Sequence, residues 1–327
     1  MSMEKKDILW QDIIQKNEET NTSSLVSTLN NTPYISPQEH KERFASAPKI
    51  LQDTFLLEDD GSFLIQTPEK SKVMDWHLRN IPIVPGVVMK RLFFHQTQNK
   101  AKGIVTTQFL WGAFAGQKII VRHDGIFTPT GKKLVDVNMD TQEQILSPDY
   151  HHEKEYKKME QNFDDYLLQK WAFRFVDNGE KTWVMKDNTH FRGTYTIPEN
   201  FVREENTTVS SEIFEEIAAQ LWTYLVWPDL NKNMPLIVKT ENEIQLNGES
   251  KILTFKLGKS LATDISTHVR ETVYIQGKIL TFSPEGKEAH FCYTIKNKDD
   301  QLLLSWEIKG TILPIKMLVR SYQQVKK

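Results

Sequence analysis

The chain has little cysteine: Cys292 is the single one among 327 residues. A lone thiol cannot form an internal disulfide, and a zinc site built from cysteines needs more than one. We therefore expect a reducing, cytoplasmic setting. Cys292 falls in the strand-like run 289–295, and we interpret it as an ordinary packed residue.

Long hydrophobic runs and blocks of one charge are also missing. No stretch reaches the roughly 18 apolar residues that a membrane-spanning helix needs. The first residues, MSMEKKDILWQDII, contain no apolar signal core, so export is not expected. With 41 basic and 43 acidic residues the net charge is −2, whereas a dedicated nucleic-acid-binding protein normally carries a basic excess. We expect neither a membrane span nor a nucleic-acid partner.

Several enzyme motifs are absent as well. There is no Gly-x-Ser-x-Gly segment and no Walker-type phosphate loop, and the glycines at 112, 116 and 125 do not form a dinucleotide fingerprint. His151, His152 and Glu153 lie in a charged stretch without a third ligand at a recognisable spacing. We interpret them as solvated surface, and we expect no metal site and no cofactor.

The chain contains the same order of secondary-structure elements twice, one helix with several antiparallel strands. We divide the chain into a polar arm (1–47), a first unit (48–146), a charged helical connector (147–180) and a second unit (181–327). In each unit, hydrophobic periodicity predicts a helix, at 87–96 and at 211–225. Strands are predicted at 62–66, 103–110, 118–121, 133–138, 182–196, 236–246, 252–257, 271–282, 288–296 and 302–313, with turns near Gly116 and in the 125–131 region. The class is α+β, with an antiparallel sheet wrapped around each helix. The units do not repeat each other in sequence, so the duplication is inferred from the order of elements.

The most informative segment of the first unit is WHLRNIPIVPGVVM, residues 76–89. It places His77 in a loop stiffened by prolines, and that loop runs into Gly86 at the start of the predicted helix. The free N–H groups of a helix N-terminus stabilise a carbonyl or oxyanion, and glycine allows close approach. A histidine beside them can transfer protons near neutral pH. The simpler alternative is a loop histidine that only packs or forms a hydrogen bond.

This segment resembles the active-site motif of the β-hydroxyacyl-acyl-carrier-protein dehydratases, His-x4-Pro-x2-Pro-Gly. His77, Pro82, Pro85 and Gly86 match it in identity and spacing. Those dehydratases carry an acid on the following helix, fourteen residues after the histidine, and this chain has Arg91 there.

The first unit therefore lacks its acid. The glutamine that often follows that acid by four residues is His95 in this chain. We interpret Arg91 as surface charge and His95 as a satisfied helix residue.

The missing carboxylate has a candidate in the second helix, where Glu216 precedes Gln220 by one turn. The spacing resembles the acid-bearing helix of the same dehydratases. Helical geometry puts Glu216 opposite the apolar stripe of Phe214, Ala218 and Leu221, so the alternative is a solvated helix face. The second unit, in turn, has no matching histidine segment.

One unit keeps the histidine and the other keeps the acid. The chain thus resembles the fused double-hotdog dehydratases, including dehydratase domains of polyketide and polyunsaturated fatty-acid synthases. The resemblance implies that a (3R)-hydroxyacyl thioester, on an acyl carrier protein or coenzyme A, loses water to become a trans-2-enoyl thioester. His77 would be the base and Glu216 the acid. Gly86, with Pro85 before it, would hold the carbonyl, and Gln220 would orient the acid. The chain would be a monomeric pseudo-dimer or a homodimer.

Two alternatives stay open. The same fold supports isomerases, thioesterases and acyltransferase–decarboxylases that act on such thioesters, because a fold does not fix a reaction. The second alternative is a non-catalytic partner that binds acyl thioesters for a synthase.

Overall fold

The computed structural model describes residues 36–58, 63–69, 74, 82–98, 103–140, 144–148, 156–158, 182–185, 189–197, 208–209, 214–219, 237–239, 244–246, 251–262, 267–268, 271–283 and 288–325. We call residues 36–148 the first half and residues 182–325 the second half.

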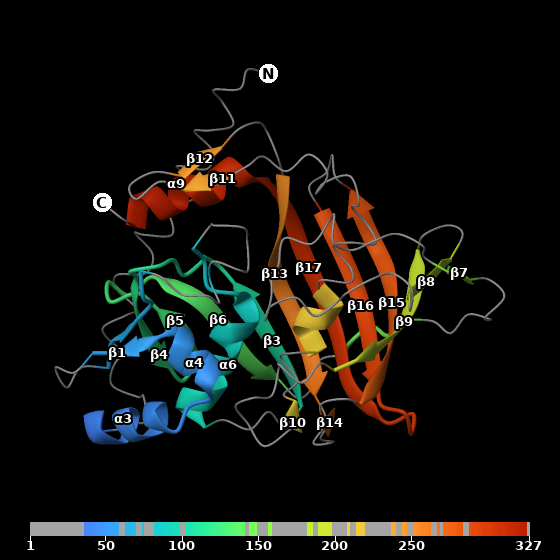
Figure 1. The fold of residues 1–327 in the computed structure, drawn as a ribbon, viewed down its shortest axis with the longest axis horizontal. Helices are drawn as coiled ribbons and strands as arrows, with labels where there is room; N and C mark the ends of the chain where they lie inside the picture. The colour runs from blue at the N-terminus through green and yellow to red at the C-terminus, as the bar shows by residue number, and fades with distance from the viewer. Residues whose placement is uncertain are drawn as a thin grey trace.

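The first half contains helices and strands in the following order: α3 (Pro37–Ala45), α4 (Lys49–Thr54), β1 (Leu56–Leu57), β2 (Ile65–Gln66), α6 (Gly86–Thr97), β3 (Ile104–Phe109), β4 (Lys118–Arg122), β5 (Gly125–Phe127) and β6 (Lys133–Asp140). Strand β7 (Tyr156–Lys158) follows it. In Figure 1, α6 lies against the curved strands β3 to β6, with α3 and α4 beside it.

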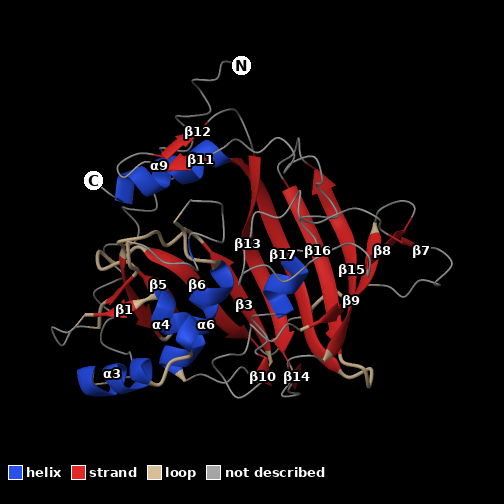
Figure 2. Cartoon of the chain, in the orientation of Figure 1, coloured by secondary structure: helices blue, strands red, loops and turns tan. Residues whose placement is uncertain are grey.

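The second half is richer in strands, as the red arrows of Figure 2 show. Its strands are β8 (Thr182–Met185), β9 (His190–Thr196), β10 (Thr208–Val209), β11 (Ile237–Lys239), β12 (Ile244–Leu246), β13 (Lys251–Ala262), β14 (Thr267–His268), β15 (Thr272–Ser283), β16 (Glu288–Lys296) and β17 (Leu302–Pro314). Residues 214–219 form a helix, which we call the 214–219 helix, and α9 (Ile315–Val325) ends the described chain.

Both halves contribute to one sheet of 13 strands in the order β1-β2-β4-β5-β6-β3-β13-β17-β16-β15-β9-β8-β7. From the middle outward the first half runs β3-β6-β5-β4-β2, and the second half runs β13-β17-β16-β15-β9. Among the strands of this sheet, in each half the first one after the helix is central, the next three follow in reverse order, and a strand from before the helix comes last. Strands β10 and β14, and strands β11 and β12, form two separate two-stranded sheets. The strand order of the first half is therefore repeated in the second.

The two halves meet where β3 pairs with β13, and we call this pairing the seam. The strands are antiparallel, with Val105 opposite Ser260 and Thr107 opposite Gly258. Since these pairs join residues about 150 positions apart, the seam unites the two halves into one continuous sheet.

The helix α6 forms because its apolar residues recur with the helical period. Val88, Met89, Leu92 and Phe93 are all buried and lie on one stripe of the helix. They pack in a shared hydrophobic core with residues of the surrounding strands, including Ile119, Ile126, Leu134 and Val135. Gly86, the first residue of α6, packs on the ring of Phe109, and Phe109 follows the last residue of β3 that pairs with β13. The N-terminus of α6 is therefore close to the seam.

In the second half, a row of side chains crosses the sheet on one face. Register puts Ser260 beside Trp306, Trp306 beside Tyr293, Tyr293 beside Gly277, and Gly277 beside Phe191. The ring of Tyr293 stacks on Trp306 and meets Phe191 edge-on, with centroids 5.6 Å apart in each pair. Burial raises the pKa of Tyr293 well above its usual value. This aromatic row begins at the seam.

The helix α9 contacts the first half. The ring centroids of Tyr322 of α9 and Phe114 are 5.9 Å apart, and Val319 is buried.

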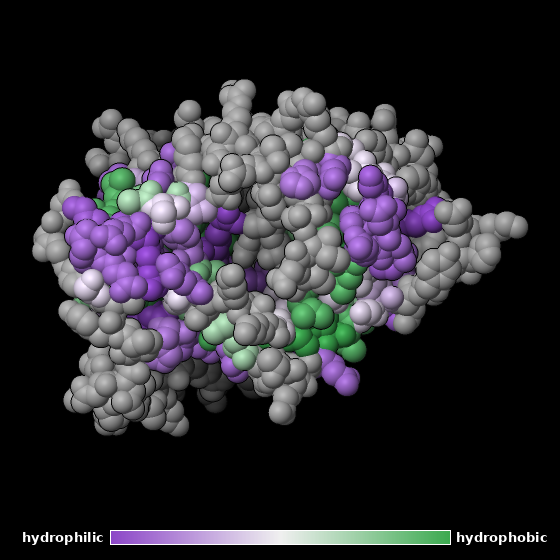
Figure 3. Space-filling model, turned by 90° about the horizontal axis from the view of Figure 1, so that it is seen from below, coloured by the Kyte–Doolittle hydropathy of each residue, from purple (hydrophilic) through white to green (hydrophobic). Residues whose placement is uncertain are grey.

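Figure 3 views the molecule from below and shows hydrophilic side chains on the side of α3 and of the β16–β17 hairpin. No described helix is long and apolar enough to span a bilayer.

Most of the predicted helices and strands are confirmed. The helix predicted at 87–96 is α6, and the strand predicted at 288–296 is β16 with the same ends. Residues 214–219 of the helix predicted at 211–225 are helical. Gly116 has a positive φ of 78° and forms a turn as expected. Cys292 is buried in β16, as predicted.

Three features of the structure differ from the sequence analysis. Residues 37–45 form helix α3 and pack on α6, where a polar arm was predicted, because Phe44 and His40 are buried there. Residues 156–158 form strand β7, so the helix predicted for the connector is wrong at these positions. The C-terminal helix α9 was not predicted. The turns predicted in the 125–131 region are confirmed, by contrast: residues 123–124 and 129–130 form turns, and Gly125 begins strand β5 directly after the first of them.

We predict that Gly277→Ala destabilises the protein by about 1–3 kcal/mol. A Cβ at position 277 would lie 2.1 Å from Cζ of the buried Phe191 ring, so the aromatic row would have to move. The free energy of unfolding, measured in urea, checks this. Gly258→Ala is the matched control: its Cβ would approach Trp306, with Nε1 at 3.1 Å and Cε2 at 3.8 Å, and should cost less. Equal losses in both variants would contradict the prediction.

We also predict that the protein loses stability below about pH 6.5 through His40. Burial lowers the pKa of His40 and the charge of Arg43 lowers it further, although contact with Gln96 opposes this. The unfolded chain therefore binds a proton more readily than the folded one, and acid favours unfolding. Urea unfolding at pH 7.5 and 5.5 should show a smaller pH effect for His40→Gln than for the wild type. The exposed His123→Gln is the control.

Candidate functional site

The second part of the first-half motif, Pro82–Pro85, is buried and firmly held. Val84 N–H donates to Ala113 O at 2.8 Å, and Ala115 N–H donates to Pro82 O at 2.9 Å. All four residues of this segment are buried. The loop therefore enters α6 in one fixed direction, which sets the position of Gly86.

Gly86 is the first residue of α6, and Pro85 is its N-cap, with no side-chain capping bond. The N–H groups of Val88 and Met89 donate to Pro85 O, both at 3.1 Å. The N–H groups without an acceptor inside the helix are therefore those of Gly86 and Val87. A Cβ on Gly86 would lie 2.9 Å from the Phe109 ring, so glycine is required for this close packing. The N–H groups of a helix N-terminus can stabilise a carbonyl or an oxyanion that approaches them.

Two of the predicted site residues, His77 and Gln220, lie outside the described residues. So do His151, His152 and Glu153. Their roles stay predictions from the sequence.

Glu216 lies on the 214–219 helix, and all six residues of this segment are buried. Its exposed fraction is 6%, and that of its neighbour Glu215 is 3%. The alternative given above for Glu216, a solvated helix face, is therefore wrong. The apolar stripe of Phe214, Ile217 and Ala218 is buried as well, so this helix is enclosed on all sides rather than amphipathic.

The two helices are joined by a buried ion pair that the sequence analysis missed. Lys90 Nζ of α6 donates to Glu215 Oε1 at 2.5 Å and to Ser260 Oγ of β13 at 2.7 Å. The Lys90 and Glu215 side chains are 5% and 4% exposed, although they are 125 residues apart in sequence. A lysine among the apolar residues of α6 was the available signal, because a buried lysine normally has a charged partner.

This contact brings the ends of the two motifs together. Gly86 precedes Lys90 by four residues, which is about 6 Å along a helix axis, and Glu216 directly follows Glu215. A buried carboxyl group and the N-terminus of α6 therefore belong to neighbouring helices at the seam. In Figure 1 the short yellow helix lies in front of β13, with α6 on its other side. Such a site can exchange a proton and stabilise negative charge on a substrate oxygen.

Two residues of α6, Arg91 and His95, replace the acid and the glutamine in the first half. His95 Nε2 lies 2.7 Å from Arg43 O, and Arg43 Nη1 donates to Gln96 O at 2.5 Å. His95 is thus a satisfied helix residue, as predicted. Arg91 is only partly exposed, so it is more enclosed than the surface charge we expected.

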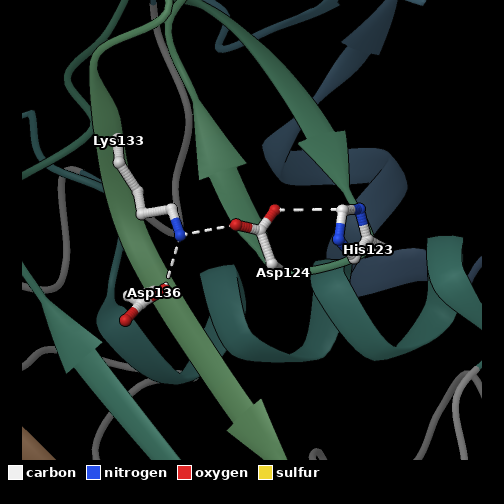
Figure 4. A network of polar contacts seen from close by, with 4 residues as sticks. All are labelled: His123, Asp124, Lys133 and Asp136. Carbon is white, nitrogen blue, oxygen red and sulfur yellow. Dashed lines mark hydrogen bonds and ion pairs between the residues drawn. The ribbon is translucent and has the colours of Figure 1, made fainter. Parts of the chain in front are cut away.

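A second polar cluster lies on the β4–β5–β6 hairpins (Figure 4). Lys133 Nζ donates to Asp124 Oδ2 at 2.7 Å and to Asp136 Oδ1 at 2.6 Å. Burial lowers the pKa of Lys133, but these hydrogen bonds and the two negative charges outweigh it, so the pKa is raised. The cluster is half-exposed and holds neighbouring strands together.

A third polar cluster lies on the face of the sheet opposite the aromatic row. His290 Nε2 of β16 is 2.8 Å from Glu307 Oε1 of β17, and Leu146 N–H donates to Glu307 Oε2 at 3.2 Å. Glu307 is buried. This contact fastens residues 144–148 to the second half. Among the described side chains, no group of three His, Cys, Asp or Glu is placed to hold a metal ion.

No protein-family model matches the sequence. No curated protein matches it either. Among solved structures, the chain is similar to the dehydratase domain of PpsC from Mycobacterium tuberculosis in complex with C12:1-CoA. The identity is 10%, the TM-score is 0.50, and the match covers 79% of this chain and 97% of that one.

Two further solved structures are similar at lower TM-scores. The tesB protein of Mycobacterium avium matches with 8% identity, a TM-score of 0.42, and coverage of 82% of this chain and 100% of that one. A hot dog fold protein from Alicyclobacillus acidocaldarius matches with 9% identity, a TM-score of 0.42, and coverage of 80% and 97%. At such identities the likeness to the PpsC domain concerns the fold alone. Together with the large antiparallel sheet, it assigns the chain a hotdog-type α+β fold.

We predict that Gly86→Ala destabilises the protein when Phe109 is present and not when Phe109 is shortened. Alanine is the better helix former by about 0.5–1 kcal/mol, but its Cβ would collide with the Phe109 ring. In the Phe109→Leu background the collision is relieved. A double-mutant cycle of unfolding free energies should give a coupling of about 1 kcal/mol or more, and a coupling near zero would contradict this contact.

Proposed function

We propose that the chain is a double-hotdog dehydratase that removes water from a (3R)-hydroxyacyl thioester. The repeated strand order supports two hotdog units in one chain, each with its own helix. The motif ending in Pro85 and Gly86 supports a thioester-binding site in the first unit. The fold is also that of the PpsC dehydratase domain, which was solved with a coenzyme A derivative.

The burial of Glu216 carries this proposal. A carboxyl group is rarely buried unless it is partnered or used, and Glu216 is 6% exposed on the helix where the motif spacing predicts the acid. Its neighbour Glu215 binds Lys90, one turn from Gly86. The acid of the second half and the helix N-terminus of the first half therefore serve one composite site.

In this mechanism, the Gly86 N–H donates to the thioester carbonyl oxygen and stabilises the enolate that forms when the α-proton leaves. Neutral His77 accepts that α-proton as the general base. The electron pair of the C–H bond forms the new double bond. The β-carbon–oxygen bond breaks, and protonated Glu216 gives its proton to the departing oxygen, so that water leaves.

Gln220, one turn after Glu216, would orient the acid or the hydroxyl. The reaction is redox-neutral, so its chemistry calls for no electron carrier. At the end His77 is protonated and Glu216 is ionised, and a proton transfer through water restores the starting state. The thioester would enter on an acyl carrier protein or on coenzyme A.

The test is mass spectrometry of the purified protein with a short (3R)-hydroxyacyl thioester of pantetheine. We expect loss of 18 Da, the mass of one water, and loss of the reaction by a factor of about 100 or more in His77→Ala and in Glu216→Gln. The enoyl thioester is tested in the reverse direction as well, because hydration can be favoured at equilibrium.

Matched controls are the exposed His123→Ala and the exposed Glu288→Gln, which should keep wild-type turnover. Release of free acid in place of the enoyl product would identify a thioesterase and reject the dehydratase. Thioester binding without turnover in either direction would favour a non-catalytic partner. Full activity in Glu216→Gln would remove this residue from the mechanism.

A further inference from the structure

Lys90 and Glu215 occupy equivalent positions in the two halves. By motif spacing, Arg91 stands in the first half where Glu216 stands in the second, since each precedes the glutamine position by four residues. One step back along each helix are Lys90 and Glu215. These two residues are the ones that contact each other, with Nζ and Oε1 2.5 Å apart.

The sheet supports the same equivalence independently. β3 and β13 are each the first strand of the large sheet after the helix, and they pair with each other in antiparallel orientation. Equivalent strands that pair in this way are related by a two-fold rotation perpendicular to the sheet. A residue near a two-fold axis meets its own equivalent, as in isologous dimers. Lys90 and Glu215 are therefore expected close to a local two-fold axis.

We infer that Lys90 and Glu215 are positioning residues, which select the pairing of unlike halves and hold Gly86 and Glu216 in one site. The inference rests on the proposed function. If two first halves paired across such an axis, Lys90 would meet a second Lys90, and two second halves would bring Glu215 against Glu215. Both contacts would bury like charges, which is strongly unfavourable. Opposite charges at this position permit only the mixed pairing.

The ion pair between Lys90 and Glu215 also fixes the rotation of the two helices about their axes. Lys90 is held by two acceptors, Glu215 Oε1 and Ser260 Oγ at 2.7 Å, so its position is fixed against both the other helix and the sheet. Successive residues on a helix are about 100° apart, so anchoring Glu215 also sets the direction of the Glu216 side chain. Anchoring Lys90 sets the position of Gly86, four residues earlier on α6. An apolar contact would hold the helices together without fixing their rotation.

The first experiment reverses the charges. Lys90→Glu and Glu215→Lys, made singly in the full chain, bury like charges and should lower kcat/KM and the melting temperature sharply, with kcat/KM falling by about 100-fold or more. The double variant Lys90→Glu with Glu215→Lys restores opposite charges, and the Ser260 hydroxyl can donate to the new carboxylate. It should recover kcat/KM to within about tenfold of the wild type. A double variant no better than the singles would overturn the inference.

The second experiment separates positioning from stability. Lys90→Met with Glu215→Met replaces the ion pair by an apolar contact of similar volume, which keeps or raises the melting temperature. A positioning role predicts that kcat falls at least about tenfold while KM changes less than about threefold, since the acid is misdirected but the thioester still binds. An unchanged kcat in a folded double variant would leave the pair a purely structural role and overturn the inference.

Lys296→Glu is the matched control, because Lys296 Nζ lies 2.8 Å from Asp300 Oδ1 in an exposed pair. It should change neither the melting temperature nor kcat/KM measurably. A wild type that turns over no hydroxyacyl or enoyl thioester would overturn the proposed function and this assignment with it. Wild-type turnover with failed charge-swap rescue would overturn this assignment alone, so the two failures are distinguishable.

Discussion

The seam between β3 and β13 is the contact on which the rest of the structure depends. It is short, with four paired positions from Val105 to Gln108 on the first-half side, yet it makes one sheet out of two. Backbone hydrogen bonds alone specify a register weakly when neighbouring registers bury similar side chains. The buried contact among Lys90, Glu215 and Ser260 lies over this seam and distinguishes one register from the others.

Burying that ion pair has an energetic cost, because both charges lose their hydration. The cost is offset when the geometry is good and additional hydrogen bonds satisfy the charges, as Ser260 does for Lys90. An apolar pair would be at least as stable on general grounds. The sequence therefore retains charge at this position for a reason other than stability, and a contact with a fixed direction between two helices is the best-supported reason.

The sequence predicted the positions of the helices and strands better than the contacts between them. Hydrophobic period located α6 and β16 to within a residue or two, because both elements bury regular stripes. It could not predict that α3 packs on α6, since a helix with so many charged residues looks like a solvated arm. Strand β7 was mistaken for helix because its charged residues pair with β8 at the end of the sheet, which is a long-range contact.

The sequence predicted which residues the candidate site contains, but it did not predict how deeply they are buried or what they contact. The motif placed Gly86 at the start of a helix, and the structure has it there. Helical periodicity put Glu216 on a polar face, which suggested solvent, whereas the residue is buried. A helix wheel describes one helix and contains no information about what covers its polar side. Lys90 was overlooked for the same reason, since its partner lies 125 residues away.

The contact between Tyr322 and Phe114 has a consequence for how the protein is made. Phe114 belongs to the strand-like pairing that holds the loop before Gly86, so residues close to the last described position pack against the first-half motif. A ribosome releases the first half long before residue 322 emerges, and one edge of β3 has no partner until β13 (Lys251–Ala262) has been made. While the second half is being made, the first half therefore exposes a strand edge and apolar surface that can bind other chains. Early binding by a chaperone would protect this surface until the second half covers it.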